Sequence, residues 1–159
     1  PNLQASVIVM SDSISKGTKH DKSGKAIVTK LEECGISNIN YHIIPDEKED
    51  LQNLVNESLE KGSKLIITTG GTGLSPRDIT PESLRPMLDT KIPGIMEAVR
   101  SYGQERTPYS MLSRGIAGLI NDTLVLALPG STKGASESMD ALFPYILHIY
   151  RVIKGRRHD

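Results

Sequence analysis

Apolar residues along the chain form short, dense runs separated by polar stretches that contain glycine, proline or aspartate. Runs of this kind, rich in valine, isoleucine and leucine, are typical of buried β-strands, whose side chains are covered on both faces of a sheet. We therefore predict strands over residues 5–10, 39–44, 64–69, 118–120 and 123–128, with a tight turn joining the last two.

Between the predicted strands, apolar residues recur at the three- and four-residue spacing of amphipathic helices. One helix begins near Ser23 and ends before Gly35, which suits a left-handed C′ position. Asp46 is the expected N-cap of the next helix, where Glu49 completes a capping-box pattern and Gly62 closes the helix. These two helices would connect the first three strands.

The second half of the chain predicts three further helical segments. Thr80 is the expected N-cap of the first, with Pro81 at the first helical position. The second carries apolar residues between 95 and 102. The last carries them between 139 and 150, where Pro144 should kink or divide the helix.

The order of strands and helices predicts the fold class. Strand–helix–strand units at this spacing favour a parallel sheet with right-handed crossovers. With 159 residues and no internal repeat or linker-like tract, the chain fits one globular domain spanning residues 1–159. We expect an α/β protein, a three-layer α/β/α domain with a mostly parallel central sheet.

The composition excludes several classes of protein. Basic and acidic residues both number 19, and the formal net charge of +0 disfavours a nonspecific nucleic-acid binder. No apolar run approaches the ~20 residues that cross a bilayer, and the N-terminus lacks the pattern of a secretory signal, so we expect a cytoplasmic protein with no membrane partner. Cys34 is the single cysteine, which excludes an internal disulfide and a cysteine-cluster metal site.

Charge is nevertheless distributed unevenly along the chain. Four lysines and one aspartate give residues 16–25 a net charge of +3, whereas six acids and one lysine give residues 44–60 a net charge of −5. Runs of charge usually form solvated faces. The basic stretch would also suit a polyanionic ligand if the fold brings it beside a phosphate site.

Several familiar cofactor and catalytic motifs fail on spacing. Pro76 stands where the third glycine of a Rossmann fingerprint would follow Gly71 and Gly73, which argues against a nicotinamide-dependent oxidoreductase. The glycines around Lys25 do not have the spacing of a P-loop, and the segment at Gly134 is an incomplete nucleophile elbow. The four histidines are scattered without the spacing of zinc ligands.

Two loops of small residues follow predicted strands and precede predicted helices. Gly70–Gly73 comes after the strand at residues 64–69, and Pro129–Gly134 comes after the strand at residues 123–128. Glycines allow backbone N–H groups to approach an anion closely, and helix N-termini favour negative charge. Ligands of open α/β sheets bind at the carboxyl ends of the strands. The pair of loops therefore predicts a phosphate-binding edge, although each loop alone fits an ordinary turn.

Asp46 and Asp78 also lie between a strand end and a helix. Mg²⁺ prefers oxygen ligands and usually takes one or two carboxylates plus phosphate, so both residues are candidates for holding Mg²⁺ against a triphosphate. Asp21 is a weaker third candidate. The structural alternatives are a helix N-cap for Asp46 and an ion pair with Arg77 for Asp78.

Seven segments occur in a characteristic order: Ser11–Ser13, Asp21–Gly24, Ile44–Glu47, Thr69–Gly73, Pro76–Glu82, Met111–Arg114 and Leu128–Ser131. Together they resemble the MogA/MoaB family of molybdenum-cofactor biosynthesis proteins, which includes the G domain of gephyrin. The resemblance covers residues 6 to about 153, and the block from Gly70 to Glu82 is its most specific part.

The resemblance implies a molybdopterin adenylyltransferase, which converts molybdopterin and Mg-ATP into adenylyl-molybdopterin and pyrophosphate. Asp46 and Asp78 match the two essential acidic positions of the family, which implies a role in catalysis and in binding Mg²⁺. The nucleophile would be a phosphate with a second pKa of about 6, so no histidine base is required. The resemblance further implies that molybdopterin and ATP are bound by Ser11, Asp21, Thr69, Gly70, Gly71, Thr72, Gly73, Ser113, Pro129, Gly130, Ser131 and Lys133.

Partners and an alternative function also follow from the resemblance. Family members are typically homotrimers and some are hexamers, and a separate molybdenum-insertion protein uses their product. Thr132 stands where many adenylyltransferases have proline, and Pro129–Ser131 resembles the MoaB and gephyrin-like branches. The alternative is a non-catalytic molybdopterin-binding or carrier module of the MoaB type. The presence of Asp46 and Asp78 favours the enzyme.

Overall fold

The computed structural model describes residues 3–158, with side chains up to residue 155. Six strands make one sheet: β1 Gln4–Met10, β2 Asn38–Ile44, β3 Leu65–Thr69, β4 Thr90–Lys91, β5 Ala117–Ile120 and β6 Thr123–Leu128. Their order across the sheet is β2-β1-β3-β6-β5-β4. The first four in this order are parallel, and β5 and β4 extend the sheet by antiparallel pairing.

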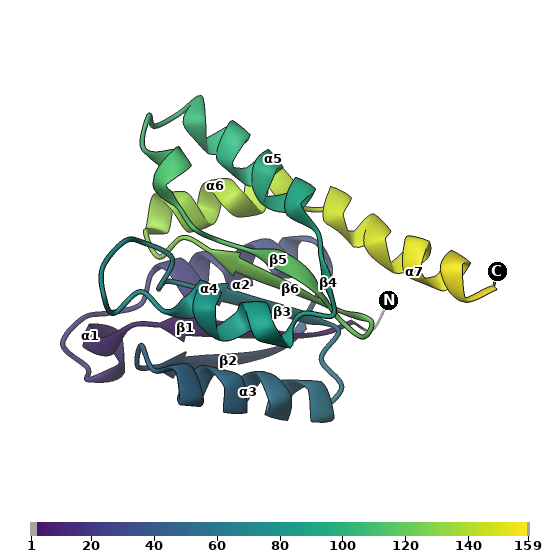
Figure 1. Ribbon diagram of the computed structural model, residues 1–159, viewed down its shortest axis with the longest axis horizontal. Coiled ribbons are helices and arrows are strands. Elements are labelled where there is room, and N and C mark those ends of the chain that lie inside the picture. The colour runs from purple at the N-terminus through teal and green to yellow at the C-terminus, as the bar shows by residue number, and fades with distance from the viewer. Residues whose placement is uncertain (1–2, 159) are drawn as a thin grey trace.

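The helices cover both faces of this sheet. They are α1 Asp12–Ser15, α2 Ser23–Glu33, α3 Lys48–Glu60, α4 Thr80–Leu84, α5 Pro93–Gln104, α6 Thr132–Leu142 and α7 Ile149–His158, with 3₁₀ turns η1 Arg85–Met87, η2 Ser110–Leu112 and η3 Tyr145–His148. In Figure 1, α3 and α4 lie on one side of the sheet, while α2, α5 and α6 lie on the other. Within residues 3–158, no helix combines the length and the apolar character needed to cross a membrane.

Two hydrophobic layers hold the helices to the sheet, because successive side chains of a strand point to opposite faces. On β3, Leu65 and Ile67 pack with the layer that contains α2, α5 and α6, whereas Ile66 packs with α3 and α4. All three side chains are fully buried. The three-layer α/β/α architecture and the mostly parallel sheet predicted from the sequence are therefore confirmed.

Short elements and helix starts differ from the sequence predictions. The predicted N-cap role of Asp46 is wrong, because Glu47 is the N-cap of α3 and makes no side-chain capping bond. Thr80 is the first residue of α4 rather than its N-cap, which is Ile79. The four-residue α1 and the two-residue β4 were not predicted, because such short segments carry no periodicity. Pro144 does divide the last helical region, since α6 ends at Leu142.

The strand order reverses at β1. From β1 the chain crosses to β2 on one side and then returns to β3 on the other side. The helices of the two crossovers, α2 and α3, lie on opposite faces of the sheet. Adjacent strands that connect in opposite directions leave a crevice at their carboxyl ends, which is where open α/β sheets bind ligands. Here that crevice lies after Met10 of β1 and Thr69 of β3.

Candidate functional site

The glycine loop after β3 closes tightly against the end of β1. Gly70 has φ +100° and Gly71 has φ +71°, which are backbone conformations that favour glycine. A Cβ atom on Gly70 would lie 2.3 Å from the carbonyl oxygen of Met10. The Thr80 hydroxyl donates to the Gly70 carbonyl at 2.9 Å, and its N–H donates to the Gly71 carbonyl at 3.0 Å. The loop is thus fixed between β1 and α4.

A cavity of about 200 Å³ lies at this switch point in the strand order. Its walls come from the ends of β1 and β3, the segment before α2, and the loops before α3 and α4. Eight residues predicted from the sequence line it together: Ser11, Asp21, Asp46, Thr69, Gly70, Gly71, Asp78 and Gly130. The two acidic residues proposed to hold Mg²⁺ therefore share one crevice.

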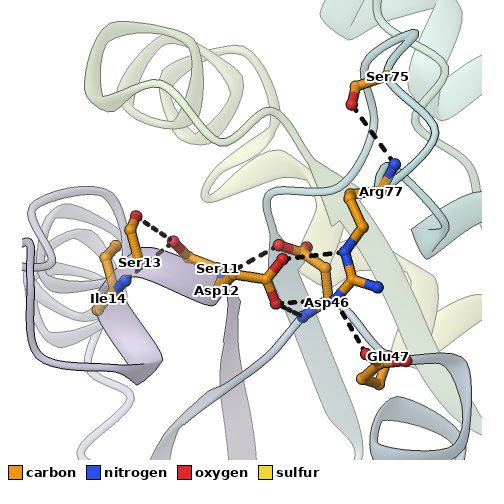
Figure 2. A network of polar contacts seen from close by, with 8 residues as sticks. All are labelled: Ser11, Asp12, Ser13, Ile14, Asp46, Glu47, Ser75 and Arg77. Atoms are coloured by element: carbon orange, nitrogen blue, oxygen red, sulfur yellow. Dashed lines mark hydrogen bonds and ion pairs between the residues drawn. The ribbon is translucent and has the colours of Figure 1, made fainter.

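Asp46, which lines the cavity, and Asp12 hold each other in place through two hydrogen bonds (Figure 2). The N–H of Asp12 donates to Oδ2 of Asp46 at 3.1 Å, and the N–H of Asp46 donates to Oδ1 of Asp12 at 2.9 Å. The two bonds join the residues that follow β1 and β2. Oδ2 of Asp46 is thereby oriented by the backbone, while Oδ1 is left for another partner.

The Arg77 guanidinium neutralises the charge of Asp12 (Figure 2). Its Nε and Nη2 each donate to an Asp12 oxygen at 3.0 Å, and Nη2 also donates to Glu47 at 2.9 Å. These bonds lower the pKa of Asp12 below its usual value. The ion pair expected between Arg77 and Asp78 is thus replaced by pairs to Asp12 and Glu47, which leaves the Asp78 carboxylate to the cavity.

The remaining oxygen of Asp46 is the most unusual atom in the site. Oδ1 is buried and has no hydrogen-bond partner. It points toward Gly71, where a Cβ atom would lie 3.4 Å away. Burial raises the pKa of Asp46, and the nearby charges of Asp12 and Asp78 raise it further. An unpaired carboxylate oxygen buried beside a second carboxylate is a site where a cation would relieve the electrostatic cost.

Asp78 lies against the glycine loop on the other side of the cavity. Its Oδ2 accepts the N–H of Ser75 at 2.9 Å. A Cβ atom on Gly73 would lie only 2.7 Å from the same oxygen, so glycine gives the carboxylate its room. Two carboxylates with free coordination capacity fit Mg²⁺, which commonly keeps several water or phosphate ligands. No cluster of three acidic, histidine or cysteine side chains suited to a metal occurs in the described part of the chain.

Asp21 differs from the other two acidic residues because both of its oxygens have protein partners. Oδ1 accepts the N–H of Gly24 at 2.9 Å, and Oδ2 accepts the hydroxyl of Tyr41. Burial, followed by this bond to the carboxylate, raises the pKa of Tyr41 above its usual value. Asp21 therefore fixes the first turn of α2 to β2 and has less capacity for a metal than Asp46.

The second glycine loop joins the first one across the cavity. The hydroxyl of Ser23 donates to the Gly130 carbonyl at 2.6 Å, and the hydroxyl of Thr69 donates to the Pro129 carbonyl at 2.7 Å. Ser131 caps α6 by accepting the N–H of Gly134 at 3.0 Å. A Cβ atom on Gly130 would lie 2.9 Å from the Cα of Gly70, so the two loops pack backbone to backbone.

Two further hollows flank the 129–131 loop. One, of about 230 Å³, is lined by Ser113, Pro129 and Ser131 among others. The other, of about 500 Å³, contains Ser131 together with Lys19, His20, Lys22, Ser23 and Thr132. Lys19 lines the Asp46 cavity as well, so the basic stretch predicted from the sequence does lie beside the candidate phosphate site.

Three predicted binding residues, Thr72, Gly73 and Lys133, lie outside these three hollows. Thr72 is buried at 4% exposure, and Lys133 is exposed in the first turn of α6. Sequence reasoning also missed two residues that organise the site, Asp12 and Arg114. Asp12 follows a strand end just as Asp46 does, and this shared placement could have identified it. Arg114 lies 36 residues from Asp78, and no periodicity or spacing in the sequence indicates their contact.

Asp46→Asn is expected to raise the thermal midpoint of the metal-free protein at neutral pH. A carboxyl group whose folded pKa is raised destabilises the folded state as pH rises through that pKa, because the unfolded chain ionises more readily. Asparagine keeps an oxygen for the Asp12 N–H and removes the charge. The gain should shrink as pH falls through the raised pKa of Asp46 and vanish below the ordinary pKa of an aspartate, which thermal unfolding in EDTA across pH would measure.

Asp12→Asn provides the control with the opposite sign. The pKa of Asp12 is lowered, so its charge stabilises the fold above the unfolded pKa, and this contribution is lost as pH falls through the folded pKa. This variant should have a lower midpoint than the parent at neutral pH. A fall for both variants would contradict the charge repulsion assigned to Asp46.

Comparison with known sequences relates this geometry to a described family. The profile of the family MoCF_biosynth, described as "Probable molybdopterin binding domain", matches residues 6–148. The chain is 37% identical over 155 residues to the molybdenum cofactor biosynthesis bifunctional protein of Chlorobaculum tepidum, which covers 98% of this chain and 50% of that protein. The chain thus spans about half the length of that relative.

Two other matches extend over nearly the full length of both proteins. The molybdopterin adenylyltransferase of Helicobacter pylori is 36% identical over 156 residues, which cover 96% of this chain and 89% of that protein. The crystal structure of the molybdopterin biosynthesis enzyme MoaB from Thermus thermophilus superposes with a TM-score of 0.89 at 38% identity. That match covers 96% of this chain and 97% of the other.

Proposed function

The chain belongs to the MoCF_biosynth family of molybdenum cofactor biosynthesis domains, and on that premise we propose that it transfers AMP from Mg-ATP to the terminal phosphate of molybdopterin. The products are adenylyl-molybdopterin and pyrophosphate. One observation carries this proposal beyond family membership. The buried, unpartnered Oδ1 of Asp46 faces a glycine loop in the same cavity as the carboxylate of Asp78.

The reaction needs positioning and charge neutralisation more than proton transfer. An oxygen of the molybdopterin phosphate attacks the α-phosphorus of ATP, a new P–O bond forms, and the bond to the β-phosphate oxygen breaks to release pyrophosphate. A phosphate monoester has a second pKa of about 6, so the nucleophile is mostly dianionic at neutral pH. This agrees with a cavity wall, among the described residues, that contains no histidine.

Each part of the cavity has a role in this proposal. Asp46 and Asp78 would hold Mg²⁺, which when bound neutralises charge on the nucleotide phosphates and on the leaving pyrophosphate. The backbone N–H group of Gly71, which lines the cavity, would approach a phosphate oxygen, since no side chain stands in the way, whereas the Gly70 N–H donates to the Leu128 carbonyl at 3.1 Å. Lys19 and Lys22 add positive charge at the edge of the site. Arg77 pairs with Asp12 and Glu47, so its role would be to position these acidic residues rather than to bind phosphate.

The hollow beside Ser113 offers a place for either the pterin ring of molybdopterin or the adenine ring of ATP. It shares the 129–131 loop with the Asp46 cavity, and it contains Tyr109, Val99 and several hydroxyl groups. A pterin or an adenine presents a flat face and polar edges, and such ligands bind in mostly apolar pockets with a few polar groups. The reacting phosphates would then meet at the glycine loops, between the hollow beside Ser113 and the hollow that contains Lys22.

Incubation of the protein with molybdopterin and Mg-ATP tests the proposed activity. Pyrophosphate and adenylyl-molybdopterin should appear in equal amounts, and neither should appear when molybdopterin is omitted. Tight binding of molybdopterin without pyrophosphate release would instead identify the non-catalytic carrier. Failure to bind either substrate would reject both functions.

We extend the proposal to the setting in which the chain works. The relatives include bifunctional proteins of molybdenum cofactor biosynthesis, which supports a molybdenum-insertion protein as the partner that uses the product. We propose a cytoplasmic homotrimer or hexamer in which residues 1–159 act as one molybdopterin-binding domain. Sedimentation of the purified chain would measure the number of copies in the assembly.

A further inference from the structure

Asp78 lies at the end of an exposed loop, and few contacts within the loop explain its fixed position. Residues 74–77 are exposed, and the Leu74 side chain has 71% of its surface in solvent. The N–H of Asp78 donates to the Ser75 carbonyl at 2.9 Å, and the N–H of Ser75 donates to Asp78 Oδ2 at 2.9 Å. These two bonds are local to the loop, and the exposed Arg77 side chain ties the loop to Asp12 and Glu47 on one side only.

Arg114 supplies an anchor from a distant part of the sequence. Its Nε donates to the Gly73 carbonyl at 2.7 Å, and its Nη2 donates to the Asp78 carbonyl at 2.8 Å. The same guanidinium pairs with Glu82 of α4. One side chain therefore holds the residue before the exposed loop, the residue at its end, and the helix that follows.

The base of Arg114 is itself held firmly. Its N–H donates to the Thr72 carbonyl at 2.9 Å. Arg100 of α5 donates to the carbonyls on either side of Arg114, at 2.8 Å to Ser113 and at 2.6 Å to Gly115. These hydrogen bonds fix the backbone around Arg114 next to β5. The guanidinium then connects this fixed backbone to the loop.

We infer that Arg114 is a positioning residue for Asp78. This inference rests on the proposed function, in which Asp78 holds Mg²⁺. Arg114 does not line the Asp46 cavity, so it would act through the backbone of Asp78 rather than by touching substrate. The planar guanidinium reaches two carbonyls and a carboxylate at once, whereas a lysine ammonium is a single point of charge on a flexible stem.

Arg114→Lys keeps the positive charge and removes this geometry. Replacing a residue that orients a metal ligand typically costs about 10- to 100-fold in metal affinity or activity, so we expect kcat to fall by at least about 10-fold. The KM for molybdopterin should stay within about twofold, because Arg114 lines none of the three hollows and the backbone contacts of residue 114 are kept. Mn²⁺ binding in the presence of α,β-methylene-ATP, followed by electron paramagnetic resonance, should weaken by a similar factor.

Hydrogen–deuterium exchange gives a reading that does not depend on activity. Amides of residues 73–75 and 77–79 should exchange faster in Arg114→Lys, while those of β1, β3 and β6 should not change. Arg151→Lys, at an exposed residue of α7, is the matched control and should behave as the parent in every assay. Glu82→Gln removes the ion pair but keeps both carbonyl contacts, so it should have a smaller effect than Arg114→Lys.

Distinct outcomes separate this inference from the proposed function. Faster exchange at residues 73–75 and 77–79 with weakened Mn²⁺ binding and a normal KM supports the inference. Unchanged exchange at these residues overturns it, and so does a loss of kcat or Mn²⁺ binding that is equally large in Arg151→Lys. Both results would count against the inference even if the parent protein is an active enzyme. If Arg114→Lys unfolds, Arg114→Gln at low temperature gives the same exchange measurement. A parent protein that makes no pyrophosphate refutes the proposed function, whereas the exchange result stands independently.

Discussion

Asp78→Asn is expected to abolish AMP transfer while leaving molybdopterin binding within about twofold of the parent. Asparagine keeps the shape of the side chain, and it can still accept the N–H of Ser75. It lacks the negative charge that would hold Mg²⁺ beside the free oxygen of Asp46. Loss of one metal-holding carboxylate should reduce kcat by about 100-fold or more, because charge on the α-phosphate and the leaving group is no longer neutralised.

Pyrophosphate release measured at saturating molybdopterin and Mg-ATP tests this expectation. Asp140→Asn is a suitable control, because Asp140 is on the surface of α6 and pairs only with Lys30 among the salt bridges of the described residues. The control should keep the activity of the parent. Turnover of Asp78→Asn within a few-fold of the parent would show that the metal role of Asp78 is wrong.

Gly70→Ala is expected to lower the free energy of unfolding by about 3 kcal/mol. Two effects combine at this residue. The φ of +100° is strained for any residue with a Cβ atom, and that atom would lie 2.3 Å from the Met10 carbonyl oxygen. Since Met10 belongs to a central strand, relief of the contact would move the glycine loop away from β1. Activity should therefore fall together with stability.

Gly62→Ala separates the two effects. Gly62 has a similar φ of +95°, but the atom nearest to its Cβ position is Gln4 Oε1 at 3.7 Å. This control should carry only the backbone strain and lose about 1 kcal/mol in urea-induced unfolding. Equal losses for both variants would contradict the close approach between the loop and β1.

Much of the fold could be predicted because the sequence signals are local. The buried strands appear as apolar runs such as residues 65–69, and the helices α2, α3 and α5 carry regular apolar stripes. The element order then fixes a parallel sheet through its crossovers. The antiparallel β4 was missed, since its two exposed residues join the sheet only through pairing with β5.

The candidate site could be predicted as far as strand ends and side-chain chemistry allow. Asp46 and Asp78 come together because the carboxyl ends of β1, β2 and β3 share one edge of the sheet. The partners of these residues could not be predicted in the same way. The pairing of Arg77 with Asp12 spans 65 residues, and the contact of Arg114 with Gly73 spans 41. Such contacts depend on the packing of loops, which leaves no periodic trace in the sequence.

Anomalous diffraction from crystals of the protein with Mn²⁺ and α,β-methylene-ATP would locate the metal that Asp46 and Asp78 are proposed to hold. One manganese peak should lie in the cavity between β1 and β3, at about 2.0–2.2 Å from Oδ1 of Asp46 and from an oxygen of Asp78, with the nucleotide phosphates on its open side. Bound nucleotide whose metal lies away from both carboxylates would contradict it.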